Sequence, residues 1–405
     1  MLTDAVLAAI ADDYDTPAYA YDLDEVVARV RGLLAALPEH VELAYAVKAN
    51  PLPAILEVMA GEGIGADVAS GAELRAVERA GFEPNRVVFT GPGKRDEELA
   101  AAVALGLRAI TVESLGELER LRAIAAAAGR RPRIMLRAAG DDRAGNVIGS
   151  GGGRFGMRDV DLLAALRIAA ESREVELIGL HRFTASNVLD ATELLGAAGE
   201  TVALAASLET PLELIDLGGG LGIPYRDDEP ALDVGAVASG LLRLLDALDP
   251  ASRLLLEPGR YLVGPAGVYL VRVLDVKRSA KDAVIATVDG GIHHLLSPAL
   301  PGRRHRIRSL ALDAAERPLA EVVVGGPLCT TFDILGRVQL PRPCAGDLLA
   351  IGDVGAYGFT QSMPLFLSHP IPPQVVVSGG IARLASPRMD PETVLGRPGE
   401  LVSSA

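Results

Sequence analysis

One lysine, Lys48, stands where its amine could act as a nucleophile. It follows an apolar, β-favouring run at residues 41–47 and precedes Ala49, Asn50 and Pro51, which interrupt a strand. An amine that is held at a strand end and removed from water can lose its proton and form a Schiff base with a carbonyl group. A solvated lysine at a strand terminus is the more common alternative, so other residues must decide between the two.

Three successive glycines, Gly218, Gly219 and Gly220, offer a place for an anion. They follow an apolar run at residues 212–217. Because glycine has no side chain, the backbone N–H groups of such a run can approach a phosphate closely. A tight turn explains a glycine run equally well.

A carboxylate and a guanidinium, those of Glu257 and Arg260, stand close together at the end of the run 252–257. The arginine could hold a phosphate, and a buried glutamate could pair with a protonated ring nitrogen. An ordinary ion pair between the two residues is the alternative.

Short apolar runs alternate with longer amphipathic segments between residues 41 and 257. Two of the helical segments begin with the spacing of a capping box, Ser70 with Glu73 and Ser114 with Glu117. The strand candidates are eight: 41–47, 64–69, 86–90, 108–112, 132–138, 175–181, 212–217 and 252–257. Eight strand–helix units without a dinucleotide-binding glycine pattern after the first predict an α/β protein with a closed (β/α)8 TIM-like barrel rather than an open sheet.

In a barrel of this kind the chemistry lies at the carboxyl ends of the strands. An amine, an imidazole, several acids and a glycine run are all expected at that one rim. The residues concerned are Lys48, Asp67, Thr90, Arg137, His181, Gly218–Gly220 and Glu257. We therefore expect a single site there.

The pattern changes after about residue 265 to short β-like runs separated by glycine and proline. These runs predict a mostly-β domain, to which Pro17–Tyr21 could add a strand: 268–276, 283–288, 321–324, 348–351 and 374–377. We assign residues 24–265 to the barrel, 1–23 and 266–385 to the β domain, and 386–405 to a poorly ordered tail.

Composition narrows the classes of protein that the chain could be. Its 405 residues are 49% hydrophobic, enough for a substantial core, and a net charge of −14 argues against nucleic-acid binding. Two cysteines, Cys329 and Cys344, are too few for a disulfide framework and suit a reducing compartment. With neither a signal peptide nor a membrane span in the sequence, we expect a soluble cytoplasmic protein.

Taken in order, the motifs resemble those of the fold-type III pyridoxal-phosphate decarboxylases, the group that includes diaminopimelate and ornithine decarboxylases. The resemblance runs from about Thr16 to His369. The motifs that carry it are Ala44–Pro51, Ala66–Leu74, Asp216–Gly220, Glu257–Tyr261, Gly326–Cys329 and Gly355–Tyr357. It implies a carboxy-lyase of amino-acid metabolism with pyridoxal 5'-phosphate as its cofactor, and we expect no metal ion.

The resemblance also implies roles for individual residues. Lys48 would form the Schiff base with the cofactor, and Glu257 would keep its ring nitrogen protonated. An acid at that place favours decarboxylation over racemisation, since it strengthens the electron sink. Asp67 and Glu73 would lie near the cofactor, although Glu73 is equally well explained as a helix cap. The phosphate and the cofactor face would be contacted by Phe183, Ser186, Gly218, Gly219, Gly220, Gly259, Arg260 and Tyr357.

Cys329 would be supplied by the second subunit of a homodimer with shared active sites. There its thiol would return a proton to the substrate carbon after carbon dioxide leaves. A buried, unreactive cysteine is the alternative.

Several residues depart from the pattern of diaminopimelate decarboxylases. Phe183 replaces the histidine that lies against the cofactor ring, and it can stack but cannot donate a proton. His181 is expected to be a satisfied core histidine rather than a catalytic one. Thr330 stands where an acid senses a distal amino group, and Ser297 where an arginine grips a substrate carboxylate.

These departures bring the chain closer to relatives that decarboxylate aminoacyl groups held on an acyl carrier protein. A basic cluster could steer an acidic carrier to the enzyme, or it could simply pair with nearby acids: Arg303, Arg304, Arg306 and Arg308. We expect decarboxylation of an amino acid or a carrier-tethered aminoacyl group in a biosynthetic pathway. The alternatives are a diaminopimelate decarboxylase, a non-catalytic pyridoxal-binding protein and a phosphosugar-processing barrel.

Overall fold

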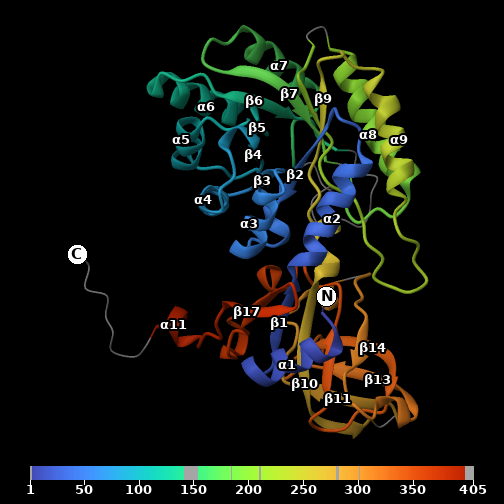
Figure 1. Ribbon diagram of the computed structural model, residues 1–405. Coiled ribbons are helices and arrows are strands. Elements are labelled where there is room, and N and C mark those ends of the chain that lie inside the picture. Colours follow the sequence, from blue (N-terminus) through green and yellow to red (C-terminus); the bar gives the residue numbers. More distant parts are fainter. Residues whose placement is uncertain are drawn as a thin grey trace. The chain divides into compact units, whose positions relative to one another are not determined.

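The computed structural model describes residues 2–140, 154–183, 185–208, 211–279, 282–300 and 302–396 (Figure 1). Two compact units make up this part of the chain. The first, the barrel unit, consists of Val27–Pro224 and Pro230–Leu262. The second, the β unit, consists of the residues up to Val26, Tyr225–Glu229 and the residues from Val263 onward.

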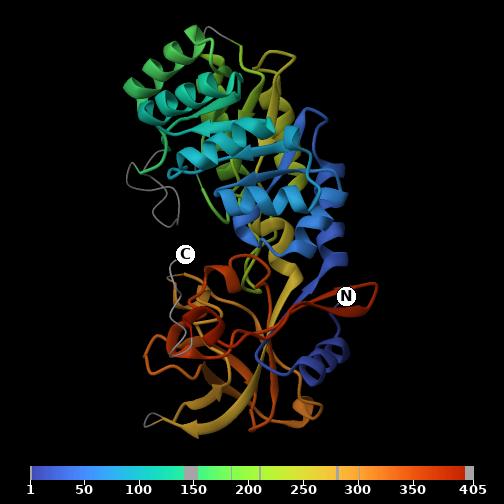
Figure 2. The same ribbon diagram turned by 90° about the vertical axis from the view of Figure 1, so that its left-hand side faces the viewer.

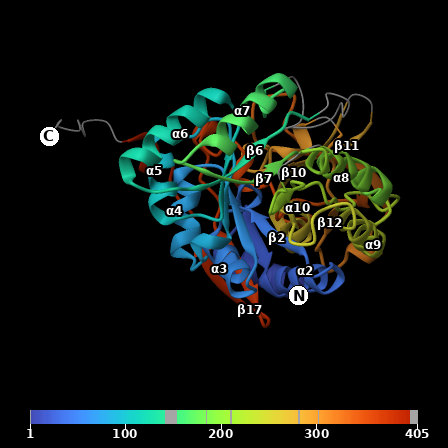
Figure 3. The same ribbon diagram turned by 90° about the horizontal axis from the view of Figure 1, so that it is seen from above.

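Within the described residues, parallel strands close a barrel in the order β2 to β9. The strands are β2 Val41–Ala46, β3 Gly65–Val68, β4 Val87–Phe89, β5 Ala109–Val112, β6 Arg133–Arg137, β7 Glu176–His181, β8 Leu214–Asp216 and β9 Arg253–Leu256. Each lies within one of the eight apolar runs, so the predicted (β/α)8 barrel is confirmed. Figure 3 shows helices on the outside of these strands.

Helices connect successive strands, as the sequence predicts. They are α2 Leu23–Ala36, α3 Pro53–Gly61, α4 Gly71–Arg79, α5 Asp96–Leu105, α6 Leu115–Ala128, α7 Asp159–Glu171, α8 Ala191–Ala206, α9 Val234–Leu245 and the short α10 Arg260–Val263. Both expected caps form, because Ser70 accepts the Glu73 N–H at 3.2 Å and Ser114 accepts the Glu117 N–H at 3.1 Å.

The barrel strands contribute side chains to one continuous apolar cluster. Its members come from β2 and from β4 through β9: Ala44, Val88, Ala109, Met135, Ile178, Leu214 and Leu255. Burial of this kind holds the strands in fixed register, since a slip of one residue would turn these side chains to the other face. The register in turn decides which rim residues become neighbours.

The β unit contains a sheet in the order β14–β13–β11–β10–β1–β16–β17, with β15 paired to β10 and β12 paired to β15. Its strands are β1 Ala18–Asp22, β10 Gly267–Arg278, β11 Val284–Val288, β12 Ile307–Ser309, β13 Leu319–Gly325, β14 Ile334–Pro341, β15 Leu348–Ile351, β16 Gln374–Ser378 and β17 Ile381–Ser386. Figure 2 shows these strands, mostly orange and red, with the blue N-terminal segment. The mostly-β prediction is confirmed, including the strand added by residues 18–22.

Sequence reasoning missed β12, β14 and β17. The last two are the outer strands of the sheet path, where side chains are partly exposed and the apolar signal is weak. It also missed helix α1, Asp4–Tyr14, which Thr3 caps at its N-terminus. Helix α1 packs through Leu7, Ile10 and Ala11 on the buried face of the sheet.

The expectation of a poorly ordered tail from residue 386 is wrong for residues 386–396. Met389 pairs with Ile371 in an isolated bridge, and a short helix, α11, spans Glu392–Leu395. Residues 397–405 lie outside the described part of the chain. Among the described residues, no helix combines the length and the apolar character needed to cross a membrane.

Candidate active site

Strand register brings polar residues together at the carboxyl ends of the barrel strands. Arg137 is the partner of His181 across β6 and β7, and His181 is the partner of Asp216 across β7 and β8. Across β2 and β3, Asp67 is the partner of Ala46, two residues before Lys48. Because the pairing is parallel, all of these side chains belong to one rim, as the sequence predicts.

Lys48 lies on a short 3-10 turn, Val47–Ala49, rather than at the end of the strand itself. The hydroxyl of Tyr45 donates to the Asn50 carbonyl at 2.9 Å and fixes the turn. The Lys48 amine donates to Asp67 Oδ2 at 2.8 Å; the lysine side chain is 45% exposed and that of Asp67 only 1%. The amine is therefore held by a buried acid while one side of it stays accessible.

Asp67 is not fully satisfied by this ion pair. Its Oδ1 is buried and has no hydrogen-bond partner within the described residues. Burial and the negative charge of Glu257 raise the pKa of Asp67, and the positive charge of Lys48 opposes them. An acid in this state can accept a further proton or hydrogen bond.

His181, Asp216 and Glu257 form a buried cluster beside Asp67. Their donor and acceptor atoms lie within 4.8 Å of one another. His181 Nε2 is 3.7 Å from Glu257 Oε2, which is too long for a hydrogen bond. Both ring nitrogens of His181, Asp216 Oδ2 and Glu257 Oε1 lack a partner in the part of the chain that the structure describes.

The prediction of a satisfied core histidine is thus wrong. His181 is buried, but neither of its nitrogens makes a hydrogen bond to another described residue. Burial lowers the pKa of His181, so the ring stays neutral at neutral pH. Buried polar atoms without partners cost free energy, and their concentration at one rim points to a ligand that would satisfy them.

The glycine run passes close to neighbouring groups that exclude side chains. A Cβ atom on Gly218 would meet Phe183 Cδ2 at 2.8 Å, and one on Gly219 would meet the Glu257 carbonyl oxygen at 2.7 Å. Gly218 and Gly220 also have positive φ angles of 68° and 108°. The run is therefore a tight turn against Phe183, and its backbone is unobstructed by side chains of its own.

The segment that carries Ser186 lies along the same glycine run. Val188 donates its N–H to the Gly220 carbonyl at 2.8 Å, and Asn187 Oδ1 accepts the N–H of Ile223 at 3.0 Å. The sequence predicts Ser186 at the phosphate, and this pairing brings its loop to the glycines.

Gly259 joins the Glu257 loop to the Lys48 turn. A Cβ atom on Gly259 would lie 2.8 Å from Ala49 Cβ, so only glycine allows the two segments to approach. Arg260, the first residue of α10, is buried, as expected for a residue that serves an internal group rather than solvent. Lys48, Glu257 and Arg260 thus belong to two segments in contact.

Glu73 has the capping role that sequence reasoning left open. Its Oε2 accepts the N–H of Ala69 at 2.7 Å, while its own N–H is bound by Ser70. Burial raises the pKa of Glu73, and the Lys48 charge opposes this effect. The carboxylate is therefore committed to the first turn of α4 and influences Lys48 only through its charge.

Cys329 and Tyr357, the other predicted site residues, belong to the β unit. Cys329 is exposed with a free thiol. Asp333 holds its loop, because Asp333 Oδ2 accepts the N–H of Leu328 at 2.7 Å and Oδ1 accepts that of Ile292 at 2.8 Å. No role was predicted for Asp333 from the sequence. Its only sign in the sequence is an acid four residues after Cys329.

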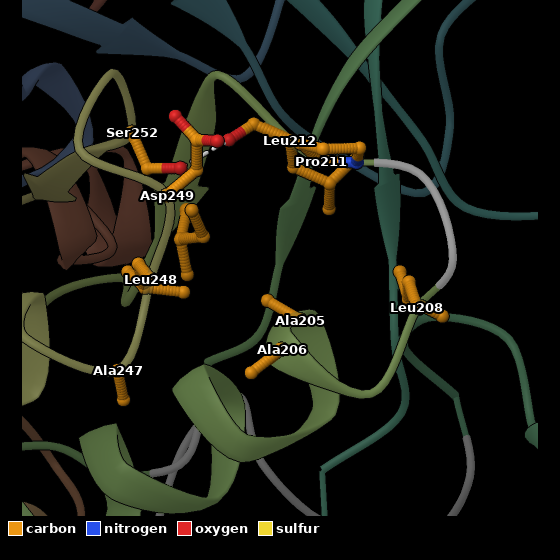
Figure 4. Close-up of a pocket in the computed structure, with 10 residues that line it drawn as sticks. Ala205, Ala206, Leu208, Pro211, Leu212, Ala247, Leu248, Asp249 and Ser252 are labelled. Carbon is orange, nitrogen blue, oxygen red and sulfur yellow. Dashed lines mark hydrogen bonds between the residues drawn. The ribbon is translucent and has the colours of Figure 1, made fainter.

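A cavity of about 210 Å³ lies at the opposite end of the strands. Figure 4 shows its mostly apolar lining, with Ser252 donating to the Leu212 carbonyl at 2.6 Å. Both residues precede their strands, β9 and β8, so the cavity is at the amino-terminal end of the barrel. It does not coincide with the polar rim.

The rim residues fit pyridoxal phosphate, the cofactor that the sequence resemblance implies. Glu257 offers a buried oxygen without a partner to a protonated ring nitrogen, and Lys48 offers an accessible amine. The glycine run offers backbone without side chains next to the Glu257 carbonyl, and Arg260, three residues after Glu257, is buried. The ring N–H of the cofactor would give Glu257 Oε1 the hydrogen-bond partner that it lacks among the described residues.

Comparison with known proteins agrees with this chemistry. Residues 23–264 match the family "Pyridoxal-dependent decarboxylase, pyridoxal binding domain". The chain is 32% identical to the L-glutamyl-[BtrI acyl-carrier protein] decarboxylase of Niallia circulans, over 94% of this chain and 92% of that protein. It is 34% identical to the diaminopimelate decarboxylase of Zymomonas mobilis, over 97% and 94%.

Solved structures agree as well. The diaminopimelate decarboxylase of Helicobacter pylori, solved in complex with L-lysine, matches with a TM-score of 0.88 at 28% identity, over 96% of this chain and 98% of that one. Since the match extends over both compact units, it includes the barrel and the β sheet. The chain therefore belongs to the pyridoxal-dependent decarboxylases and is a fold-type III carboxy-lyase that uses pyridoxal phosphate.

Proposed function

We propose that this decarboxylase acts on an aminoacyl group that an acyl carrier protein holds through its side chain. Bound pyridoxal phosphate supplies a sink for the electrons released when the carboxylate leaves the substrate. That reaction needs a free α-amino group and a free α-carboxylate. The tether must therefore be attached elsewhere, and a thioester or amide tether is neutral at the end distant from the reacting carbon.

The observation that carries the proposal is the absence of a cation at Ser297. Ser297 is buried, and its hydroxyl lies 3.0 Å from His305 Nε2. His305 Nδ1 lies 3.0 Å from the Gly352 carbonyl, which can only accept, so Nδ1 donates to it. A serine at this place brings no positive charge and suits a neutral tether, whereas diaminopimelate would bring a second carboxylate to be paired.

Thr330 supports the same conclusion at the position expected to sense a distal amino group. Its hydroxyl accepts the N–H of Phe332 at 3.4 Å within its own loop. A threonine cannot balance a distal ammonium group as a carboxylate would. The substrate end that meets these two residues should therefore carry no charge.

The basic cluster contributes less than its sequence suggests. Arg306 makes ion pairs of 2.8 Å with both Asp227 and Asp353, and Arg308 pairs with Asp4. These ion pairs support the alternative explanation, in which the arginines of the cluster simply pair with nearby acids. Arg304, which is exposed, is the member best placed to steer an acidic carrier.

The geometry of the rim supports the following residue roles. Asp67 would orient the Lys48 amine and keep it close to the carbonyl that it attacks. Glu257 would accept a hydrogen bond from the protonated ring nitrogen of the cofactor, and Phe183 would pack on the ring face. The glycine run, with Ser186, Gly259, Arg260 and Tyr357, would hold the phosphate.

We also propose a homodimer in which Cys329 completes the partner's site. An exposed, free thiol on a loop held by Asp333 is suited to reach another subunit. Exposed thiols at Cys329 and Cys344 persist most readily in a reducing compartment, which supports work in the cytoplasm.

Diaminopimelate decarboxylation is the second candidate, because several curated relatives with that name are 31% to 35% identical to this chain. The deciding experiment measures carbon dioxide release from three substrates: free diaminopimelate, a side-chain-linked glutamyl carrier protein, and the same glutamyl group on N-acetylcysteamine. We expect kcat/KM to be highest for the carrier and lowest for diaminopimelate. Preference for diaminopimelate would refute the proposal.

A further inference from the structure

Asp216 is a buried acid of the rim for which the sequence suggests no separate role. It is the last residue of β8 and begins the Asp216–Gly220 run. Its side chain is fully buried, and Oδ1 accepts the N–H of Gly218 at 2.8 Å. Its second oxygen, Oδ2, has no partner within the described residues and belongs to the cluster with Glu257 and His181.

We propose that Asp216 is a positioning residue whose carboxyl group stays protonated and donates a hydrogen bond from Oδ2 to Glu257, while Oδ1 fixes the first glycine of the run. One side chain would then keep Glu257 ionised and hold the glycine loop in place. The inference rests on the proposed pairing of Glu257 with the cofactor ring.

Electrostatics decide which member of the pair carries the proton. Two carboxylates this close in a buried site cannot both be ionised without a large cost in free energy. Asp216 faces the negative charges of Glu257 and Asp67 and has only the Gly218 N–H to oppose them. Burial and these two charges raise the pKa of Asp216 well above its ordinary value.

Glu257 has more favourable surroundings. Burial alone would raise its pKa, but the nearby His181 ring and the positive charge of Lys48 hold the pKa of Glu257 below its ordinary value. The charged groups next to His181 are Arg137 and Glu113, which pair with each other at 2.7 Å. The proton therefore stays on Asp216, and Glu257 remains an acceptor for a ring N–H.

This assignment distinguishes two substitutions of similar size. Asp216→Asn would keep both contacts, because an amide oxygen can accept from Gly218 and an amide NH₂ group can donate to Glu257. Asp216→Leu would make neither contact and would leave Glu257 with one donor fewer. If Asp216 were ionised instead, Asp216→Asn would remove a needed negative charge and would no longer be the milder substitution.

The direct test is infrared difference spectroscopy of the protein without cofactor, wild type minus Asp216→Asn, at pH 7. We expect loss of the C=O stretch of a protonated carboxylic acid, unchanged between pH 6 and 8. The matched control is Glu113→Gln, where the acid is paired with Arg137 and carboxylate bands should disappear instead. Loss of carboxylate bands in Asp216→Asn would overturn the proposal.

A second measurement uses the loaded enzyme and separates this inference from the proposed function. Asp216→Leu should lower kcat/KM about a hundredfold and shift the pH titration of the cofactor's visible band, while Asp216→Asn should lose less than about tenfold. Equal losses in both variants would overturn the role of Asp216. Failure of the wild-type enzyme to decarboxylate carrier-bound substrate would refute only the proposed function, because the infrared band reports the Asp216 proton without any substrate.

Discussion

Two sets of buried charged residues occupy the same barrel rim and differ in how well they are satisfied. In the paired set, Lys94 lies 2.7 Å from Glu117 and also donates to the carbonyls of Gly91 and Thr111. Its other members, Glu113 and Arg137, lie 2.7 Å apart. The open set comprises Asp67, His181, Asp216 and Glu257, and each of these has at least one buried atom that has neither a hydrogen bond nor an ion-pair partner among the described residues.

The difference shows which residues serve the fold and which serve a ligand. Burying a charge is costly unless it is paired, and removing one partner of a buried pair leaves that cost uncompensated. The paired set should therefore contribute to stability. The open set should be compatible with a stable fold because the bound cofactor supplies its missing hydrogen-bond partners. Substitution of its residues should therefore reduce activity more than stability.

The largest effect is expected for Lys48→Ala. Without the amine that forms the Schiff base, decarboxylation should fall about 10⁴-fold or more, and no cofactor should be fixed by borohydride. Borohydride reduction followed by mass spectrometry measures the fixation, and cofactor still fixed on the variant would show that another lysine does this work.

Lys94→Met is the matched control for that variant. Loss of this buried amine leaves Glu117 without its counter-charge and should cost about 3–5 kcal/mol of stability. Denaturant unfolding measures this loss, while the visible band of the cofactor should persist in the protein that remains folded. Stability losses of similar size in both lysine variants would erase the distinction between the sets.

Glu257→Gln should come next, with a loss of about a hundredfold in kcat/KM, because the amide no longer stabilises a protonated ring. The stability of the cofactor-free protein should not fall, since a buried charge has been removed. In the paired set, Glu113→Gln should instead lower stability by leaving Arg137 without its counter-charge. Steady-state kinetics and unfolding curves check both statements.

A mixture of two inactive variants tests whether the partner subunit supplies Cys329 to the active site. Lys48→Ala and Cys329→Ala proteins should each be inactive or nearly so. Verified heterodimers contain one intact site out of two and should recover up to about half of the wild-type activity per dimer. The measurement is carbon dioxide release after subunit exchange. Heterodimers that recover nothing would place Cys329 outside the shared site.

The pH dependence of stability should reveal His181. Its folded pKa is lowered by burial, so below about pH 6.5 this residue binds more protons in the unfolded chain than in the folded one, and its contribution to stability should fall as the pH drops from 7 to 5. His181→Gln should reduce this slope by up to about 1.4 kcal/mol per pH unit. His293 and His294 have pKa values lowered in the same direction and add to this slope, while the raised pKa of Asp67 opposes it. Unfolding of the cofactor-free protein at several pH values provides the comparison, and an unchanged slope would contradict the assignment.

The smallest effect is expected away from the rim, at Arg304. Arg304→Glu should raise KM for the carrier-bound substrate a few-fold at low salt, and leave turnover of the N-acetylcysteamine substrate alone. The effect should shrink at high salt. A loss on both substrates, or one independent of salt, would mean that this surface does not meet the carrier.

Much of the fold was predictable because its signals are local. Apolar runs of strand length and the Ser70 and Ser114 caps depend on neighbouring residues alone, and all eight barrel strands follow them. The outer strands β14 and β17 were missed because half-exposed strands lack a continuous apolar pattern. The paired state of Arg306 was not visible either, because its partner Asp227 is 79 positions away in the chain.

By itself the sequence determined which residues end each barrel strand, and thus which of them share a rim, because parallel strands place all their carboxyl ends on one side. Only the tertiary structure decided how they combine. Register set His181 between Arg137 and Asp216, and burial left the atoms of His181 without partners among the described residues. Packing brought Phe183 onto Gly218. Contact distances and local dielectric arise from residues far apart in the chain, and they alone decide which acid of the rim holds a proton.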